Sequence, residues 1–173
     1  MRLAVLLALT SVAAADPLAT QGDGSFDVGV GPAAFVTDYQ GTSVDPALAM
    51  RVAVGRFTRD DLALSIVFSD TAYLHASAST TKLDNALTFG LGAQWWVRRE
   101  LFLEAGFGLT EASNARAITD TVETDYAFLG RAGWALPLRH GTAATLSLAL
   151  THTWLDGSGS TNSIGALVGY QFL

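Results

Sequence analysis

Apolar residues alternate with polar or small residues, with a period of two, in eight segments of the chain. In the segment 26–36, for example, the alternation puts Phe26 and Val28 on one side and Asp27 on the other. The remaining segments are 48–55, 62–69, 87–96, 101–110, 126–136, 144–154 and 164–172. Alternation of this kind is typical of β-strands with one apolar face. Beyond residue 15, no apolar run approaches the ~18 residues of a membrane-spanning helix. We therefore interpret the eight alternating segments as eight strands.

The connections between these segments alternate in length. Those at 59–61, 98–99 and 137–141 are tight, whereas those near 37–45, 75–84, 112–123 and 155–161 are longer and rich in Thr, Ser, Asp, Asn and Gly. Short turns at one end and longer polar loops at the other are typical of a barrel that crosses the outer membrane, with its short turns in the periplasm. The pattern predicts an all-β fold, an eight-stranded antiparallel transmembrane up-and-down β-barrel over residues 25–173.

The two faces of the predicted strands differ in composition. One face carries Leu, Val, Ile, Phe, Ala, Trp or Tyr, and the opposite face is small or polar. Strand glycines fall on this second face at positions 29, 31, 55, 90, 92, 106, 108, 133, 165 and 169, and Gly130 alone falls on the apolar face. A soluble barrel needs the opposite arrangement, with apolar side chains inside and charged ones outside. The interior of an eight-stranded barrel is narrow and filled by side chains, so we expect the apolar face to meet lipid.

The composition strengthens the membrane interpretation and excludes several function classes. Charged residues make up 15 % of the chain and hydrophobic residues 50 %, against about 25 % charged in a typical soluble domain. The net charge is −6, the pI is near 4.8, and Lys82 is the only lysine, so no basic run could neutralise the phosphates of a nucleic acid. The chain has no cysteine, which excludes disulfides and thiolate zinc sites. We expect no cofactor.

The first fifteen residues have the form of a secretory signal peptide. Arg2 supplies a short positive region, residues 3–12 form an apolar core, and the alanines that follow place small residues at −3 and −1 of a cleavage site. The apolar run is too short to span a bilayer as an anchor. We predict a cleaved signal peptide over residues 1–15, a short periplasmic segment over 16–24, and export of the mature chain.

Four charged residues lie within strands on the predicted luminal face: Asp27, Arg51, Glu104 and Arg131. They carry two charges of each sign. Glu104 and Arg131 lie at similar depth on neighbouring strands, a placement that allows charge-assisted hydrogen bonds in a confined interior. We interpret the four as a structural luminal charge cluster that helps to plug the barrel.

The remaining charges are distributed unequally between the two ends of the predicted barrel. The long loops and outer strand ends hold Asp38, Asp45, Asp70, Asp84, Glu111, Asp120, Glu123, Asp125 and Asp156, against Lys82 and Arg116. The turn end holds Arg56, Arg59, Arg98, Arg99 and Arg139, against Asp60, Asp61 and Glu100. An acidic outer end suits divalent cations that bridge lipopolysaccharide, or a protein partner, but we favour the simpler interpretation of a solvated loop rim.

Aromatic residues gather near both ends of the apolar face. Those near the turn end are Phe26, Trp95, Trp134, Tyr170 and Phe172, and those near the outer end include Tyr126 and Trp154. Amphipathic rings at both membrane interfaces are typical of membrane barrels. We predict that these seven residues form an aromatic girdle.

Together these features resemble the small eight-stranded outer-membrane barrels of the OmpA/OmpX-like group. The resemblance covers the mature chain and rests on Gly-x-Gly strand segments at 29–31, 90–92 and 106–108 and on the closing strand 164–173. It implies residence in the outer membrane, contact with outer-membrane lipid and lipopolysaccharide, and recognition of a C-terminal aromatic, here Phe172, by the barrel-assembly machinery. A closed barrel has no edge to pair, so we expect a monomer.

An enzymatic alternative depends on one histidine. No two of His75, His140 and His152 share a metal-like spacing. His152 is predicted near the outer end of a strand on the lipid side, where a lipid A deacylase of the PagL type, also an eight-stranded barrel, uses a His/Ser/Glu set. This chain has Trp154 where a His-x-Ser motif would place its serine, and no glutamate follows Glu123. A lipid-modifying barrel enzyme of the outer leaflet is therefore the alternative hypothesis.

A narrow ion or solute channel lined by the luminal charges is a further alternative. A continuous pore is not expected at eight strands, and Phe35, Trp96, Phe102 and Arg131 would obstruct it. We therefore expect a non-enzymatic integral outer-membrane barrel with a side-chain-filled lumen and acidic surface loops. Its expected contribution is to envelope structure or surface interaction.

Overall fold

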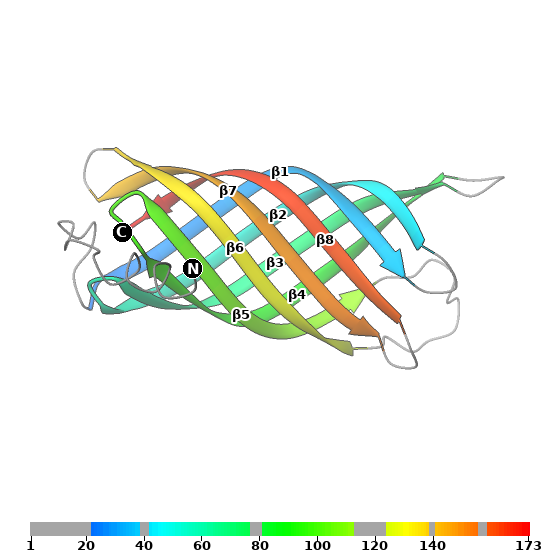
Figure 1. The fold of residues 1–173 in the computed structure, drawn as a ribbon, viewed down its shortest axis with the longest axis horizontal. Coiled ribbons are helices and arrows are strands. Elements are labelled where there is room, and N and C mark those ends of the chain that lie inside the picture. The colour runs from blue at the N-terminus through cyan, green and yellow to red at the C-terminus, as the bar shows by residue number, and fades with distance from the viewer. Residues whose placement is uncertain (1–21, 39–41, 77–80, 113–123, 139–140, 156–158) are drawn as a thin grey trace, which may run out of the picture.

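The computed structural model describes residues 22–38, 42–76, 81–112, 124–138, 141–155 and 159–173. The strands are β1 (Gly24–Asp38), β2 (Thr42–Arg59), β3 (Leu62–Ala76), β4 (Thr81–Trp96), β5 (Leu101–Ala112), β6 (Thr124–Pro137), β7 (Thr142–Leu155) and β8 (Gly159–Phe172). They pair antiparallel in chain order, and β8 returns to β1, so they form a closed barrel (Figure 1). The structure confirms the predicted eight-stranded up-and-down barrel. No helix in the described part of the chain is long and apolar enough to cross a membrane.

The strands are longer than the segments of apolar alternation, and they extend mainly at the outer end. β2 begins at Thr42 and β8 at Gly159, inside the predicted loops 37–45 and 155–161. β3 and β4 likewise extend into the predicted loop 75–84. The structure corrects these loop boundaries: backbone pairing between β1 and β2 and between β3 and β4 continues into segments that are rich in polar residues.

Three of the predicted segments lie outside the described residues. They are the signal peptide 1–15, all but the last residues of the periplasmic segment 16–24, and nearly all of the outer loop 112–123. Their assignments stay predictions.

Side-chain exposure alternates along the strands as the sequence predicts. The outward Leu91 and Phe107 are 67 % and 69 % exposed, whereas the inward Phe102 is 1 % exposed. Outward positions over the middle of the barrel are apolar. Inward positions are mostly small, hydroxyl-bearing, amide-bearing, charged or aromatic, with the aliphatic Val67, Leu129 and Leu167 among them. A continuous apolar wall of this extent is unfavourable in water and favourable in a bilayer. The apolar face is therefore the lipid-facing face.

Luminal glycines allow neighbouring strands to curl tightly. Gly90 of β4 pairs directly with Gly108 of β5. A Cβ atom added at Gly108 would collide with the carbonyl oxygen of Phe89. Gly130 faces outward, and a Cβ atom there would meet only the ring of Phe128, at 3.2 Å. The difference fits a narrow barrel, in which crowding is on the inside.

The seam between β1 and β8 closes the barrel and is interrupted in its middle. Pairing stops at Val30 and resumes at Ala33 in the same register, so Gly31 and Pro32 lie in the gap. Proline has no N–H and cannot donate to a ladder. The missing donor explains the interruption, which lies within the apolar band of the wall.

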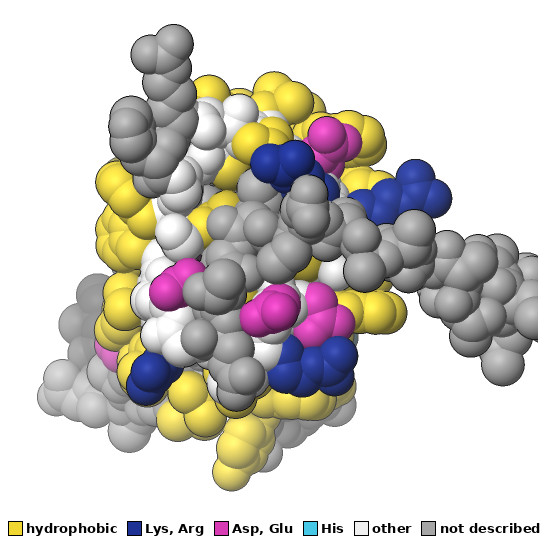
Figure 2. Space-filling model, turned by 90° about the vertical axis from the view of Figure 1, so that its left-hand side faces the viewer, with side chains coloured by type: hydrophobic (Ala, Val, Ile, Leu, Met, Phe, Trp, Pro, Cys, Tyr) yellow, Lys and Arg dark blue, Asp and Glu magenta, His cyan; other side chains and the backbone are white. Residues whose placement is uncertain are grey.

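The short turns gather at the end where β1 begins and β8 ends. Between β2 and β3 the register shifts between Phe57 and Arg59, so Thr58 forms a bulge. Gly22 folds back on this bulge and donates its N–H to the carbonyl oxygen of Phe57 at 2.8 Å. Viewed from this end, several basic and acidic side chains lie among and beside hydrophobic ones (Figure 2).

Candidate functional site in the barrel lumen

The structure brings the four predicted luminal charges together. Arg51 of β2 contacts Asp27 of β1 at 2.7 Å and also contacts Glu104 of β5. Arg131 of β6 contacts the same Asp27 oxygen at 2.9 Å and Glu104 at 3.9 Å. The four side chains are at most 6 % exposed. Each carboxylate thus lies between two guanidinium groups in a network with no net formal charge, which we call the luminal charge network.

Strand register and barrel curl both contribute to this network. Glu104 and Arg131 are direct partners across the β5–β6 ladder, as their similar predicted depth indicates. The closer contact of Glu104 is nevertheless with Arg51, which reaches it across the lumen from β2. Local pairing therefore identifies one contact of Glu104 and misses the closer one.

Further side chains complete the surroundings of Arg131. Its Nε donates to Ser147 Oγ at 2.8 Å and its Nη2 to Thr145 Oγ1 at 3.4 Å, both from β7. Its guanidinium carbon lies 4.8 Å from the centroid of the Phe102 ring. Sequence reasoning did not name Ser147 or Thr145 as partners, although alternation in the segment 144–154 places both on the luminal face.

The energetic role of the network follows from its burial. A buried charge without a partner is strongly unfavourable, and a buried pair is tolerated when its remaining hydrogen-bonding groups are satisfied. Here nearly all are satisfied, although Asp27 Oδ2 has no hydrogen-bond partner among the described residues. The network connects β1, β2, β5, β6 and β7 inside the barrel, independently of the backbone ladder.

Towards the turn end, the lumen is filled by amides and then by apolar side chains. Gln171 Nε2 donates to Gln94 Oε1 at 2.8 Å. The apolar cluster beyond this pair consists of Phe57, Ala63, Trp96, Phe102, Ala135 and Ala143. Trp96 and Phe102 therefore lie inside the lumen, where the sequence analysis predicted them as obstructions.

Towards the outer end, the lumen is filled by hydroxyl groups and a pair of stacked rings. Thr71 Oγ1 lies 2.8 Å from Ser163 Oγ. Beyond them, Phe35 and Tyr73 stack with ring centroids 4.0 Å apart and planes inclined by 7°. Phe35 is thus a third predicted obstruction found inside the barrel.

Several acidic residues of the outer strand ends face this part of the lumen. Asp45, Asp84 and Asp125 are buried. Asp45 is the register partner of Phe35, and Asp84 is the partner of Tyr73. If the alternation of each strand is continued towards the outer end of the barrel, it places these carboxylates in the lumen. Asp120, Glu123 and Asp156, also predicted for the outer rim, lie outside the described residues.

The seven predicted girdle residues all lie on the outward face. Phe26, Trp95, Trp134 and Phe172 are exposed near the turn end, with Tyr170 half-buried beside Phe172, and Tyr126 and Trp154 are exposed near the outer end. The rings of Phe26 and Phe172 lie 6.0 Å apart across the β1–β8 seam. Their role at the membrane interfaces stays a prediction.

His152 lies on the outward face near the outer end of β7. Its Nδ1 is 2.8 Å from Oδ1 of Asn162 on β8, and its ring meets Trp154 edge-on at 4.5 Å. The described residues contain no group of three or more His, Cys, Asp or Glu side chains that could hold a metal ion.

Comparison with known proteins finds likeness in fold. No family model and no curated protein matches the chain. The crystal structure of Neisserial surface protein A superposes with a TM-score of 0.63 at 16 % identity, covering 87 % of this chain and 99 % of that one. Ail, the attachment invasion locus protein of Yersinia pestis, superposes with a TM-score of 0.54 at 14 % identity, covering 88 % and 100 %.

A third similar structure was determined in a membrane. The outer membrane protein AlkL, solved in lipid bilayers, has a TM-score of 0.54 at 11 % identity and covers 88 % of this chain and 90 % of its own. At such identities the likeness concerns the fold alone. The fold is that of small outer-membrane barrels, which agrees with the predicted fold class and with the outer membrane as the predicted location.

Proposed function

We propose that this chain, an eight-stranded outer-membrane barrel of the OmpA/OmpX-like type, neither conducts ions nor catalyses a reaction. It acts through its exterior and its outer end, in envelope structure or surface interaction. The proposal rests on one observation, namely that side chains fill the lumen at three levels. From the outer end to the turn end, these levels are the Phe35–Tyr73 stack, the luminal charge network, and the apolar cluster that contains Trp96 and Phe102.

The filled lumen argues against the channel alternative. An ion that entered from the outer end would meet stacked rings and then four charges already neutralised by one another. Opening a path would require breaking buried ion pairs, which is costly when one partner is left uncompensated. The charges therefore hold the barrel together rather than line a pore.

The outer end supports a role in surface contact. β2, β3 and β4 run to the outer end of the barrel (Figure 1). Near that end, Val44, Leu74 and Leu83 are exposed on the outward side. The sequence of this end is predominantly acidic. Ail has been solved with the heparin analogue sucrose octasulfate, a polyanion. The acidic end of this chain favours instead a cationic partner, either divalent cations that bridge lipopolysaccharide or a basic protein surface.

The non-enzymatic part of the proposal is supported by the surroundings of His152. Its hydrogen-bond partner is the amide of Asn162, and its ring neighbour is Trp154. Neither side chain supplies a nucleophile or a carboxylate. We further propose that the chain contacts outer-membrane lipid, that the barrel-assembly machinery inserts it, and that it acts as a monomer, since a closed barrel has no edge to pair.

Two measurements test the proposal. The first compares boiled and unboiled protein on an SDS gel, where faster migration of unboiled protein reports a closed barrel, and then records conductance in planar bilayers. We expect a closed barrel without current steps; steady ion conductance would favour the channel. The second compares lipid A from cells that overexpress the wild type or His152→Ala. We expect identical lipid A, and a change that depends on His152 would favour the enzyme.

A further inference from the structure

Arg56 is the last outward-facing residue of β2 before the bulge at Thr58. It continues the outward row of Val52 and Val54 and pairs with Leu64 of β3. Its side chain therefore leaves the barrel wall at the turn-end border of the apolar band. Arginines at such a border extend their charged ends towards the lipid headgroups.

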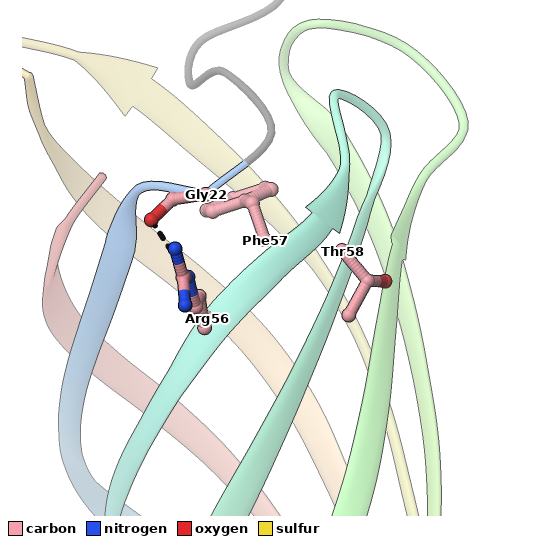
Figure 3. A pocket seen from close by; sticks show the side chains of 4 residues that line it. All are labelled: Gly22, Arg56, Phe57 and Thr58. Carbon is pink, nitrogen blue, oxygen red and sulfur yellow. Dashed lines mark hydrogen bonds between the residues drawn. The ribbon is translucent and has the colours of Figure 1, made fainter.

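The guanidinium group of Arg56 is oriented by the main chain. Its Nε donates to the carbonyl oxygen of Gly22 at 2.9 Å (Figure 3). Gly22 has φ +98°, a conformation that favours glycine, and a Cβ atom there would lie 3.4 Å from Arg56 Nη2. The hydrogen bond between Gly22 N–H and the Phe57 carbonyl oxygen fixes Gly22 in turn. The Nε edge is thus occupied, whereas no described residue accepts a hydrogen bond from the Nη groups, which can therefore reach a ligand.

The charge of Arg56 is not neutralised by the protein in the described part of the chain. Arg51 and Arg131 are paired inside the lumen, and Arg59 pairs with Asp61 at 3.1 Å. Arg56 makes no ion pair among the described residues; its one hydrogen bond there is to the neutral Gly22 carbonyl. A guanidinium stays protonated at all relevant pH values, so it attracts an external anion.

An open pocket of about 490 Å³ lies beside this guanidinium, lined by Gly22, Arg56, Phe57 and Thr58 (Figure 3). The hydroxyl of Thr58 already donates to the Leu62 carbonyl oxygen at 3.1 Å. Phe57 is buried in the apolar cluster of the lumen. Among the described lining residues, Arg56 is therefore the charged one, and the other three shape the pocket.

We propose that Arg56 and this pocket bind the phosphate group of a phospholipid in the leaflet at the turn end. Two Nη groups in one plane match two phosphate oxygens, which is the geometry that arginine provides and lysine does not. The exposed ring of Phe26 lies on the same outward face, on the strand next to Arg56, where it would contact the glycerol or the upper acyl chain. A soluble phosphate offers the same oxygens, so the test separates the two sources.

The test measures how tightly single lipids are retained. Full-length mature protein in detergent micelles is mixed with phosphatidylglycerol or with a phosphate-free galactolipid of the same acyl chains, and bound lipid is counted by native mass spectrometry. We expect the wild type to prefer phosphatidylglycerol and Arg56→Gln to bind it roughly tenfold more weakly, the loss of one charge-assisted contact. Arg59→Gln is the matched control, because Arg59 is already paired, and should bind like the wild type.

The remaining variants and outcomes decide the assignment. Unboiled gel mobility checks that each variant is folded, and Arg56→Lys, which keeps the charge without the planar group, should bind phosphatidylglycerol at an intermediate strength. Equal retention by wild type and Arg56→Gln, or an equal loss in Arg59→Gln, would overturn the proposal. Displacement of phosphatidylglycerol by millimolar inorganic phosphate would overturn the assignment to lipid and make soluble phosphate the ligand.

Discussion

Arg131 and Asp27 stand 104 residues apart in the chain and form a 2.9 Å ion pair across the lumen. The Asp27 oxygen that accepts this hydrogen bond also accepts one from Arg51 at 2.7 Å. The pair joins the first strand to the sixth through the interior, whereas the backbone ladder joins them only around the wall. The luminal charge network is therefore a second set of constraints on barrel shape.

Loss of Arg131 should destabilise the barrel strongly. Arg131→Met leaves Asp27 and Glu104 with a single guanidinium between them, so we expect the free energy of unfolding to fall by about 3–5 kcal/mol. The change is measured by unfolding the protein with urea in lipid vesicles and reading the folded fraction from its mobility on an unboiled gel. The double variant Asp27→Asn/Arg131→Met restores neutrality and should recover part of the loss. A single variant within about 1 kcal/mol of the wild type would show that the network does not stabilise the barrel.

A methyl group on the luminal side should be costly where the same group on the lipid side is not. Gly108→Ala places a Cβ atom against the Phe89 carbonyl oxygen, so we expect a loss of about 1–3 kcal/mol from crowding. Gly130→Ala is the matched control, because its Cβ atom meets only a ring edge on the outside. The same unfolding measurement compares them, and equal losses would contradict the crowding argument.

Two phenylalanines of β5 provide a test of the faces. Phe102→Ala empties a buried luminal position beneath Arg131 and should lower the free energy of unfolding by about 3–5 kcal/mol. Phe107→Ala removes an outward ring, and lipid can fill the space, so we expect a clearly smaller loss. The reverse order would mean that the faces are assigned wrongly.

Restoring the interrupted pairing between β1 and β8 should stabilise the barrel. Pro32→Ala supplies an N–H where the pairing is interrupted, and we expect a gain of roughly 1 kcal/mol together with protection of the new amide from hydrogen exchange. Pro46→Ala is the control, because no strand pairing is interrupted at Pro46. The β1–β2 pairing continues through it, and the β2–β3 pairing begins only at Ala47. An unprotected amide at position 32 would show that the seam is open for another reason.

Alternation was enough to predict the number of strands and the direction of their side chains. The same signal misses where strands begin at the outer end, because β2 starts with the polar residues Thr42 and Ser43, before the outward apolar row that Val44 opens. Backbone hydrogen bonds between neighbouring strands do not require apolar side chains, so the strand pairing continues there. Boundaries inferred from apolar alternation therefore underestimate the length of the strands.

The members of the luminal charge network could be predicted, but not all of their contacts. Parity identifies Asp27, Arg51, Glu104 and Arg131 as luminal, and adjacency suggests the Glu104–Arg131 pair. The contact between Arg51 and Glu104 depends on how tightly the sheet curls, which depends on many strand pairings at once. Arg56 was predicted only as one of the turn-end arginines, since its orientation depends on the fold-back of Gly22.

The neighbours across the seam, β1 and β8, are the first strand made and the last. A partly synthesised chain therefore has no complete ring to form, and any sheet it builds keeps two open edges that invite aggregation. Folding to the native state must wait until translation has produced β8, so closure of the barrel is separated in time from synthesis of β1. A chain cut short before β8 is consequently not a smaller barrel but an unclosed sheet.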